Sequence, residues 1–240
     1  MNILYKNTNV HYLTKNAGSK AIMFLHGWGG SVNSFYSLSN FLDDQKTKHI
    51  LIDFPPFGKS QEPNSPWELD DYVQIVRQVL EQENIKKVSF VAHSFGGRVA
   101  ICFANKYTDI VEKLIITGGA GIIPKKSLKK QLKKLCYKTI RLFNKKINLG
   151  SKDYKNLSFV MKKTFSNIIN EDLSEISKNI SQKTLLVYGA KDKETPIYMA
   201  KIFNKNIKNS KLIIYKKYGH FCYLENFYEF ANTTHEFLKD

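Results

Sequence analysis

Residues 91–100 read VAHSFGGRVA. The apolar run at 87–92 predicts a buried strand, and residues 96–107 predict a helix that follows it at once. Ser94 lies at the turn between the two, and the glycines at 96 and 97 leave room for a sharp bend. A serine at such a turn either caps the helix with its side chain or presents its hydroxyl as a nucleophile. Residues elsewhere in the chain must decide between these two interpretations.

Short apolar runs alternate with helix-type segments along most of the chain. Few of the apolar runs alternate with polar residues, which is typical of strands covered on both faces. The pattern predicts an α/β fold with a mostly parallel, doubly wound sheet. The predicted strands are 10–13, 21–25, 48–52, 87–92, 113–117, 184–188 and 211–215, and the predicted helices are 34–43, 66–82, 96–107, 196–206 and 223–238.

Residues 121–182 interrupt this alternation. They contain no clear strand, they look helical, and they hold 15 Lys and Arg against 4 Asp and Glu. We therefore expect a core of residues 1–120 and 183–240, with 121–182 inserted as a Lys-rich helical cap. Leu128 and Leu132 recur at helical spacing opposite paired lysines, so the leucines would rest on the core while the lysines face outward.

Composition sets further bounds. The 240 residues carry a net charge of +16, and the three cysteines lie far apart without metal-ligand spacing, so we expect no metal, no cofactor and no disulfide framework. No apolar run approaches the roughly 18 residues that span a bilayer, and the chain is expected to be soluble and cytoplasmic. The basic excess reflects either compositional bias or an anionic partner, an acidic carrier protein or an anionic membrane surface. No nucleic-acid recognition motif accompanies it, so no nucleic-acid partner is expected.

Two residues further along the chain could complete a catalytic set with Ser94. Asp192 follows the strand at 184–188, and His220 follows the strand at 211–215. Parallel strands bring these ends to one sheet edge, where His220 would take the serine proton and Asp192 would orient His220. Asp192 could instead be an ordinary turn residue, and Glu194 is close enough to compete as the acid.

The stretch HGWGG at 26–30 follows an early strand. Its glycines would let main-chain N–H groups approach a ligand. We expect the N–H groups of Trp28 and Phe95 to bind a developing oxyanion, the latter helped by the start of the following helix. The Trp28 ring is either a wall of the substrate pocket or part of the core.

Four elements in order make the chain resemble the α/β-hydrolase superfamily over essentially its whole length: HGWGG at 26–30, DFPPFGKS at 53–60, AHSFGG at 92–97, and the pair Asp192 and His220. The resemblance implies the fold predicted above and a helical cap at the insertion. The sequence departs from the family pattern at two positions: Ala92 replaces the first glycine of the serine turn, and Pro56 replaces a common glycine. Neither departure removes a catalytic group.

The resemblance, with serine as nucleophile, implies a hydrolase of carboxylic esters or thioesters with small or medium acyl groups. The branches that use an aspartate nucleophile, the haloalkane dehalogenases and epoxide hydrolases, do not fit. Open alternatives are a carbon–carbon bond hydrolase of the same family, a hydrolase of acyl-carrier-protein esters, a membrane-surface lipase and a non-enzymatic ligand-binding protein. The expected pocket residues are Trp28, Leu128, Leu132, Phe143 and Phe159.

Overall fold

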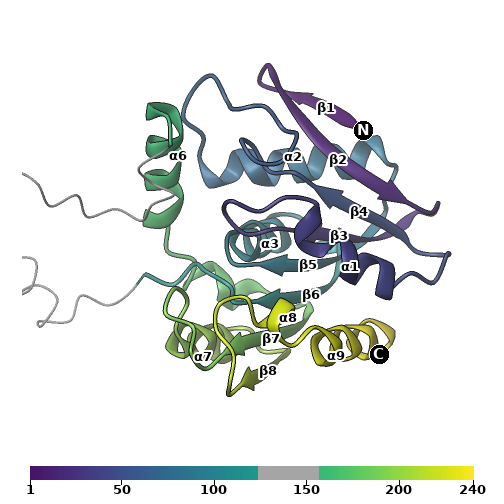
Figure 1. The fold of residues 1–240 in the computed structure, drawn as a ribbon, viewed down its shortest axis with the longest axis vertical. Coiled ribbons are helices and arrows are strands. Elements are labelled where there is room, and N and C mark those ends of the chain that lie inside the picture. The colour runs from purple at the N-terminus through teal and green to yellow at the C-terminus, as the bar shows by residue number, and fades with distance from the viewer. Residues whose placement is uncertain (124–156) are drawn as a thin grey trace, which may run out of the picture.

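An eight-stranded sheet runs through the protein, which we describe from a computed structural model of residues 1–123 and 157–240 (Figure 1). The strand order is β1-β2-β4-β3-β5-β6-β7-β8. The pairs from β4 through β3 to β8 are all parallel, whereas β1 and β2 join antiparallel at one end. The strands are β1 (Asn2–Tyr5), β2 (Thr8–Lys15), β3 (Lys20–Leu25), β4 (Lys48–Ile52), β5 (Lys87–His93), β6 (Val111–Thr117), β7 (Lys183–Gly189) and β8 (Ser210–Tyr215).

Helices cover both faces of the sheet, as the uninterrupted apolar strands predicted (Figure 1). Along β5, Phe90 packs into the core beneath one helical layer, and the next residue, Val91, packs into the core beneath the other. The predicted doubly wound α/β class is thus confirmed. Successive strand residues point to opposite faces of the sheet, so a strand that is apolar throughout needs a helical layer on each face. One layer holds α2 (Leu69–Gln82), α3 (Phe95–Lys106) and α7 (Ile197–Asn206), and the other holds α1 (Asn33–Phe41) and α9 (Phe227–Lys239).

The structure differs from the predicted elements at three places. Strand β1 was not predicted, because half of its residues are exposed and its apolar pattern is short. Helix α2 begins at Leu69 rather than at 66, since Glu68 and Asp71 form a reciprocal capping box there. The helix predicted at 223–238 is divided into two helices, α8 (Cys222–Glu225) and α9. The division falls at Asn226, whose φ of −127° and ψ of 51° are not helical.

The described end of the insertion contains α6 (Phe159–Asn170) and the 3₁₀ turn η2 (Ile176–Asn179). Side chains fasten α6 to the core. The Thr164 hydroxyl accepts a 2.9 Å hydrogen bond from the Trp67 N–H, and Asn167 donates to the Trp67 carbonyl. The predicted residues Leu128, Leu132 and Phe143 lie outside the described residues.

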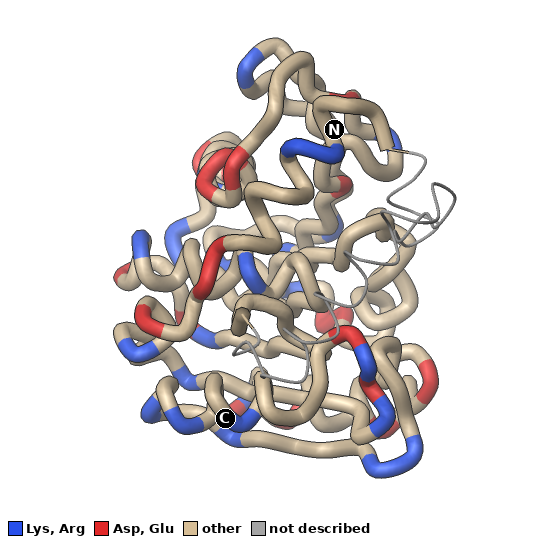
Figure 2. The backbone as a smooth tube through the Cα atoms, turned by 90° about the vertical axis from the view of Figure 1, so that its left-hand side faces the viewer, with Lys and Arg blue, Asp and Glu red and all other residues tan. Residues whose placement is uncertain are grey.

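Most of the basic excess also lies outside the described residues. Residues 124–156 hold 12 of the 37 Lys and Arg but one of the 21 Asp and Glu. Over the described backbone, Figure 2 shows basic and acidic positions interspersed. The described residues hold 25 Lys and Arg against 20 Asp and Glu, so they account for only 5 of the 16 net positive charges. None of the described helices is long and apolar enough to cross a bilayer.

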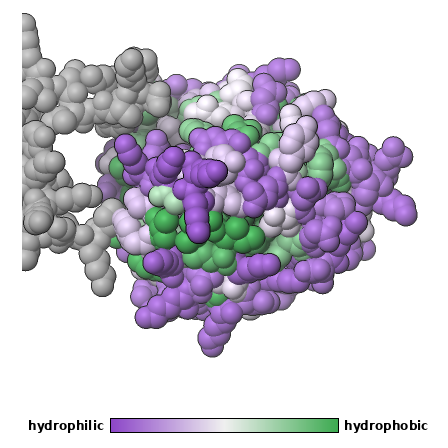
Figure 3. Space-filling model, turned by 60° about the horizontal axis from the view of Figure 1, so that its bottom comes forward, coloured by the Kyte–Doolittle hydropathy of each residue, from purple (hydrophilic) through white to green (hydrophobic). Residues whose placement is uncertain are grey.

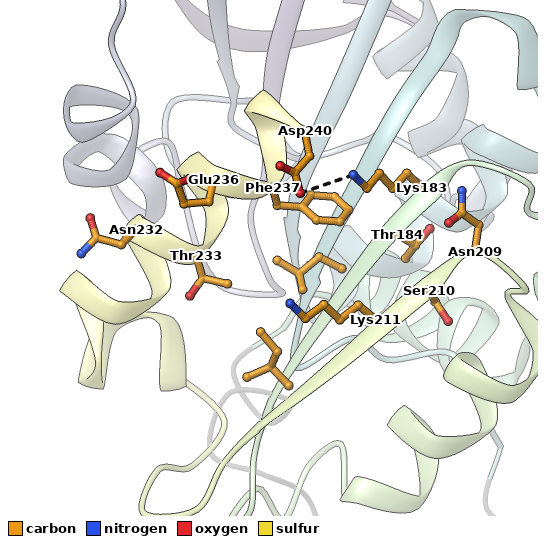
Figure 4. A pocket seen from close by; sticks show the side chains of 12 residues that line it. Lys183, Thr184, Asn209, Ser210, Lys211, Asn232, Thr233, Glu236, Phe237 and Asp240 are labelled. Atoms are coloured by element: carbon orange, nitrogen blue, oxygen red, sulfur yellow. Dashed lines mark ion pairs between the residues drawn. The ribbon is translucent and has the colours of Figure 1, made fainter.

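A groove of about 500 Å³ lies at the sheet edge where β7 and β8 begin (Figure 4). It lies beside α9, and its lining includes Lys183, Lys211 and Phe237. An ion pair between Lys183 and Asp240 crosses its rim. Figure 3, which brings the lower side of Figure 1 forward, shows an apolar area bordered by hydrophilic side chains. Because β7 and β8 end at the opposite edge of the sheet, this groove is separate from the loops that follow these strands.

Candidate active site

Ser94 lies on the tight turn between β5 and α3. Its backbone has φ 50° and ψ −108°, a conformation that is costly for any residue with a side chain. The surroundings enforce it: the Ser94 N–H donates to the Thr117 carbonyl at 3.1 Å, and a Cβ at Gly96 would overlap the Leu25 carbonyl oxygen. The Ser94 side chain makes no capping hydrogen bond to α3. Ser94 therefore stands at the N-cap position of α3 without capping the helix through its side chain.

Asp192 and His220 meet across the ends of β7 and β8. The His220 Nδ1 atom lies 2.8 Å from Asp192 Oδ2. A carboxylate only accepts hydrogen bonds, so Nδ1 carries the proton and Nε2 is left as the basic nitrogen. This tautomer is the one that a general base next to a serine requires.

Several donors hold the Asp192 carboxylate in place. The main-chain N–H groups of Glu194 and Thr195 donate to Oδ1, and the Thr195 hydroxyl donates to Oδ2 at 2.6 Å. Burial by itself would raise the pKa of Asp192, but the hydrogen bonds from His220 and Thr195 lower it overall. The carboxylate therefore stays ionised at neutral pH and can stabilise a protonated His220.

Glu194, the competing acid, occupies a different position. Its carboxylate lies 3.9 Å from His220 Nε2, on the other side of the ring from Asp192, and its side chain is 74% exposed. A pair at this distance with one partner exposed to solvent is worth little energetically. Of the two carboxylates, Asp192 is the one with the geometry of an orienting residue.

The loops that hold Ser94 and His220 are packed together through Gly118. Thr117, which binds the Ser94 N–H, precedes Gly118, and a Cβ on Gly118 would lie 3.2 Å from the His220 carbonyl oxygen. No hydrogen bond of the described residues joins the Ser94 hydroxyl to the His220 ring. Such contacts often tighten only when substrate binds. The proton transfer from Ser94 to His220 therefore remains a prediction.

The loop after β3 brings the Trp28 N–H beside this turn. A Cβ on Gly27 would lie 3.4 Å from Ser94 Cβ, so the two segments are in direct contact. The His26 ring supports the loop: its Nε2 accepts from the Phe54 N–H at 2.8 Å, and its Nδ1 donates to the Gly27 carbonyl at 2.7 Å. Neither the Trp28 nor the Phe95 N–H has a hydrogen-bond partner among the described residues. Both are free to receive an oxyanion.

The DFPPFGKS segment is organised by the buried Asp53 carboxylate. Its oxygens accept hydrogen bonds from the Val32 N–H at 2.7 Å, the Lys59 N–H at 2.9 Å and the His11 ring at 2.8 Å. Gly58 has φ +60°, and a Cβ there would overlap the Asp53 carboxylate. Through these hydrogen bonds, Asp53 joins this segment to β2 and to the loop before α1.

The Trp28 ring connects the core to the described part of the insertion. It is half-buried, and its centroid lies 5.5 Å from that of Phe95 and 5.0 Å from that of Phe165 on α6. It therefore lies between α6 and the helix that begins at the serine turn. Phe159, the expected pocket residue on α6, is 83% exposed. Phe165 is better placed to border a pocket next to Trp28.

Other chemistries are weakly represented among the described residues. Burial raises the pKa of the Cys102 thiol to about 12 and that of Cys222 to about 11, so both stay protonated and unreactive. In the same part of the chain, no group of three or more His, Cys, Asp or Glu is arranged to hold a metal ion. Ser94 is therefore the best-placed nucleophile that the structure describes.

Comparison with known families gives the same picture. A family model described as alpha/beta hydrolase fold matches residues 20–145, which is more than half of the chain. The chain belongs to the alpha/beta hydrolase fold family. A second model, described as TAP-like protein, matches residues 167–240 of this alpha/beta hydrolase.

Similar proteins extend over the whole length of this alpha/beta hydrolase. A 2-hydroxy-6-oxononadienedioate/2-hydroxy-6-oxononatrienedioate hydrolase of Burkholderia vietnamiensis is 24% identical over 262 residues, covering 96% of this chain and 91% of the relative. Among solved structures, an esterase of Exiguobacterium antarcticum superposes with a TM-score of 0.78 at 21% identity, covering 97% of this chain and 96% of its own. A meta-cleavage product hydrolase of Pseudomonas fluorescens superposes with a TM-score of 0.76 at 19% identity, covering 100% of this chain and 97% of its own. At these identities the structures show the shared fold alone.

Sequence reasoning missed three residues of the site. Thr195 binds Asp192, Phe165 contacts the Trp28 ring, and His93 donates to the main chain of His220 at 3.1 Å. The position of His93 directly before Ser94 was a signal that could have singled it out. Phe165 carries no comparable signal, because its partner Trp28 is far away in the sequence. Thr195 lies only three residues after Asp192, so its closeness to the candidate acid was a signal that could have been used.

Proposed function

We propose that the protein is a serine hydrolase of carboxylic esters or thioesters with small or medium acyl groups. The observation that carries the proposal is the 2.8 Å hydrogen bond between Asp192 and His220 at the same sheet edge as the strained Ser94 turn. This arrangement supplies a nucleophile, a base with the correct tautomer and an orienting carboxylate. The proposal needs no cofactor.

The reaction would proceed in two halves. Ser94 Oγ attacks the acyl carbon while its proton passes to His220 Nε2, and the N–H groups of Trp28 and Phe95 bind the oxyanion. The tetrahedral intermediate collapses to an acyl-enzyme, and His220 gives its proton to the leaving alcohol or thiol. A water molecule then attacks the acyl-enzyme, losing a proton to His220, and the acid is released as Ser94 regains its proton.

Aromatic side chains support an uncharged, apolar acyl group. The Trp28 ring lies 5.0 Å from the Phe57 ring and also contacts the rings of Phe95 and Phe165. Rings arranged around a half-buried tryptophan offer apolar contact area beside the oxyanion donors. We therefore expect a preference for aliphatic or aromatic acyl chains over acyl chains that carry a carboxylate.

A carbon–carbon bond hydrolase is the second candidate. The observation in its favour is the set of relatives named as 2-hydroxy-6-oxononadienedioate hydrolases, which match almost the whole chain. That name describes a dicarboxylate. Glu194 places a negative charge near His220, and the buried Arg98 donates to main-chain carbonyls rather than facing the site. Both observations favour the ester over the dicarboxylate.

The test compares wild type with Ser94→Ala on p-nitrophenyl esters from acetate to palmitate, with a fluorophosphonate probe for Ser94. Hydrolysis that depends on Ser94 and prefers one chain length supports the proposal. Labelling of Ser94 with no ester turnover, but with cleavage of 2-hydroxy-6-oxononadienedioate, selects the second candidate. Absence of labelling in a folded wild-type protein contradicts both and points to a ligand-binding protein.

A separate proposal concerns an anionic partner for the Lys-rich residues 121–182. Their lysines fall mostly within residues 124–156, so the described surface does not contain them. An acidic carrier protein that delivers the acyl group is one partner of suitable charge, and an anionic membrane surface is the other. Activation by anionic vesicles that disappears at high salt would favour the membrane, because salt screens exposed charges.

A further inference from the structure

His93 is the last residue of β5 and directly precedes Ser94. Its side chain is buried, with 2% of the residue exposed. The ring donates from Nε2 to the His220 carbonyl oxygen at 3.1 Å, and the two histidine rings lie 4.7 Å apart. The His93 side chain is therefore bonded to the main chain that carries the proposed base.

The other ring nitrogen of His93 faces residues 26–30 after β3, which contain the proposed donor Trp28 N–H and are named the oxyanion loop. A Cβ on Gly27 would lie 2.6 Å from His93 Nδ1 and 3.2 Å from Cε1, so the ring already fills the space next to Gly27. Gly27 directly precedes Trp28, whose N–H is a proposed oxyanion donor. One ring thus contacts the loop of the base on one side and the oxyanion loop on the other.

Further aromatic packing holds this ring in place. The Tyr223 ring lies 4.8 Å from the His93 ring, and the Phe221 ring lies 5.2 Å from it. Tyr223 is itself buried against Phe35 on α1, at 4.9 Å. A ring held on several sides has little freedom to move, which makes it an effective spacer between loops.

The His93 ring is uncharged over the working pH range. Burial, with a smaller contribution from the nearby His220, lowers its pKa to about 3, outweighing the opposite effects of its hydrogen bond and of Asp192. The charged or titratable groups that act on it are His220, Asp192 and His26. A neutral ring that donates from Nε2 leaves Nδ1 without a proton. The donor to His220 therefore persists around neutral pH.

We propose that His93 is a positioning residue, whose Nε2–H bond to the His220 carbonyl and contact with Gly27 set the base and the oxyanion loop at their working distance around Ser94. The proposal rests on the proposed function, because it assigns His93 a task in that reaction. His93 itself exchanges no proton with substrate. Its effect passes through His220, so it should change turnover more than substrate binding.

A matched pair of substitutions isolates the hydrogen bond. His93→Gln keeps an N–H donor the same number of bonds from Cβ as the histidine Nε2, and His93→Met has nearly the same shape without a donor. We expect His93→Met to lower kcat by about 10- to 100-fold with KM within about twofold of wild type, because a small displacement of a catalytic group costs rate. We expect His93→Gln to recover most of that loss. The rate of Ser94 labelling by the fluorophosphonate should follow kcat in both variants.

The outcomes separate the two proposals. If wild type neither labels nor hydrolyses esters, the proposed function fails, and the His93 proposal falls with it. If wild type is active and folded His93→Met is equally active, the positioning role is overturned while the proposed function stands. Equal losses in both variants would also overturn it, since the N–H donor would then not matter. If His93 served only to fill space in the fold, its substitutions would lower the melting temperature but leave kcat of the folded protein unchanged.

A direct measurement keeps the proposal testable if His93→Met fails to fold. NMR of wild-type protein with ¹⁵N-labelled histidine reports which ring nitrogen of His93 carries the proton. We expect the neutral form protonated at Nε2, with slow exchange of that proton, from about pH 5 to about pH 8. A His93 ring protonated at Nδ1, or one that becomes charged within this range, would overturn the proposal.

Discussion

The Arg98 guanidinium on α3 donates a 2.8 Å hydrogen bond to the Glu171 carbonyl, directly after the end of α6. The same Nη1 atom donates to the Ile168 carbonyl at 2.9 Å. The Ile168 carbonyl also accepts the Glu171 N–H at 3.3 Å, and the buried Arg98 cation supplies a shorter, charged hydrogen bond to both carbonyls at this helix end. Arg98 therefore fastens the described end of the insertion to the helix that begins at Ser94.

Arg98→Met should loosen this attachment. The buried stem is kept, but two carbonyls at the helix end lose their bonds to the guanidinium, and we expect the free energy of unfolding to fall by roughly 2–4 kcal/mol. Because α6 carries Phe165 against Trp28, preference among ester chain lengths should also weaken. Urea unfolding and the p-nitrophenyl series measure the two effects.

Lys178→Met is the control for Arg98→Met. Lys178 also lies in the described end of the insertion, but it is exposed and pairs only with Glu175 on the surface. Such a pair contributes at most about 1 kcal/mol. Equal effects of the two substitutions would contradict the role assigned to Arg98.

Asp192→Asn should lower kcat by about 1,000-fold or more, because an amide at this position no longer selects the tautomer that leaves Nε2 basic. Glu194→Gln should change kcat by less than about threefold, since that carboxylate is exposed and 3.9 Å from the ring. Steady-state kinetics on one ester compares the pair. A larger loss with Glu194→Gln than with Asp192→Asn would reverse our assignment of the orienting acid.

Substitutions at Ser94 should reveal the strain of its turn. Ser94→Ala and Ser94→Gly both remove the nucleophile, so both should abolish ester turnover. Glycine tolerates φ 50° without the penalty that alanine keeps. We therefore expect Ser94→Gly to melt at a higher temperature than Ser94→Ala in differential scanning calorimetry. The opposite order would mean that the turn is not strained in solution.

Acid should destabilise the fold through its buried histidines. Burial lowers the pKa of His26 to about 4 and that of His93 to about 3, and it also lowers the pKa of His49. In the unfolded chain these rings take up protons below about pH 6.5. The stabilisation that comes from these neutral rings is therefore fully present above about pH 6.5. It is lost as the pH falls toward the pKa values of the rings in the folded protein.

Each such histidine steepens the pH dependence by up to about 1.4 kcal/mol per pH unit. Urea unfolding at about pH 8, 6.5, 5.5 and 4.5 measures this slope. His93→Gln should reduce the slope of the unfolding free energy against pH by about the amount that one buried histidine contributes. An unfolding midpoint that stays constant from pH 8 to 4.5 would contradict the burial of these rings as neutral groups.

Local patterns in the sequence determined the framework of the protein. The apolar runs predicted the strands of the parallel sheet, and the order Ser94, Asp192, His220 followed from residues placed just after predicted strands. These inferences succeed because strand burial and turn chemistry leave their mark within a few neighbouring residues. The weak edge strand β1 escaped prediction because its short pattern is half exposed.

Only the tertiary structure decided how the site is assembled. It gives Asp192 rather than Glu194 the Nδ1 side of His220, leaves Ser94 without a capping bond, and brings Phe165 rather than Phe159 to Trp28. It also joins His93 to His220, 127 positions further along the chain. Such contacts depend on how strands and helices pack across the sheet, so no local pattern of residues can specify them.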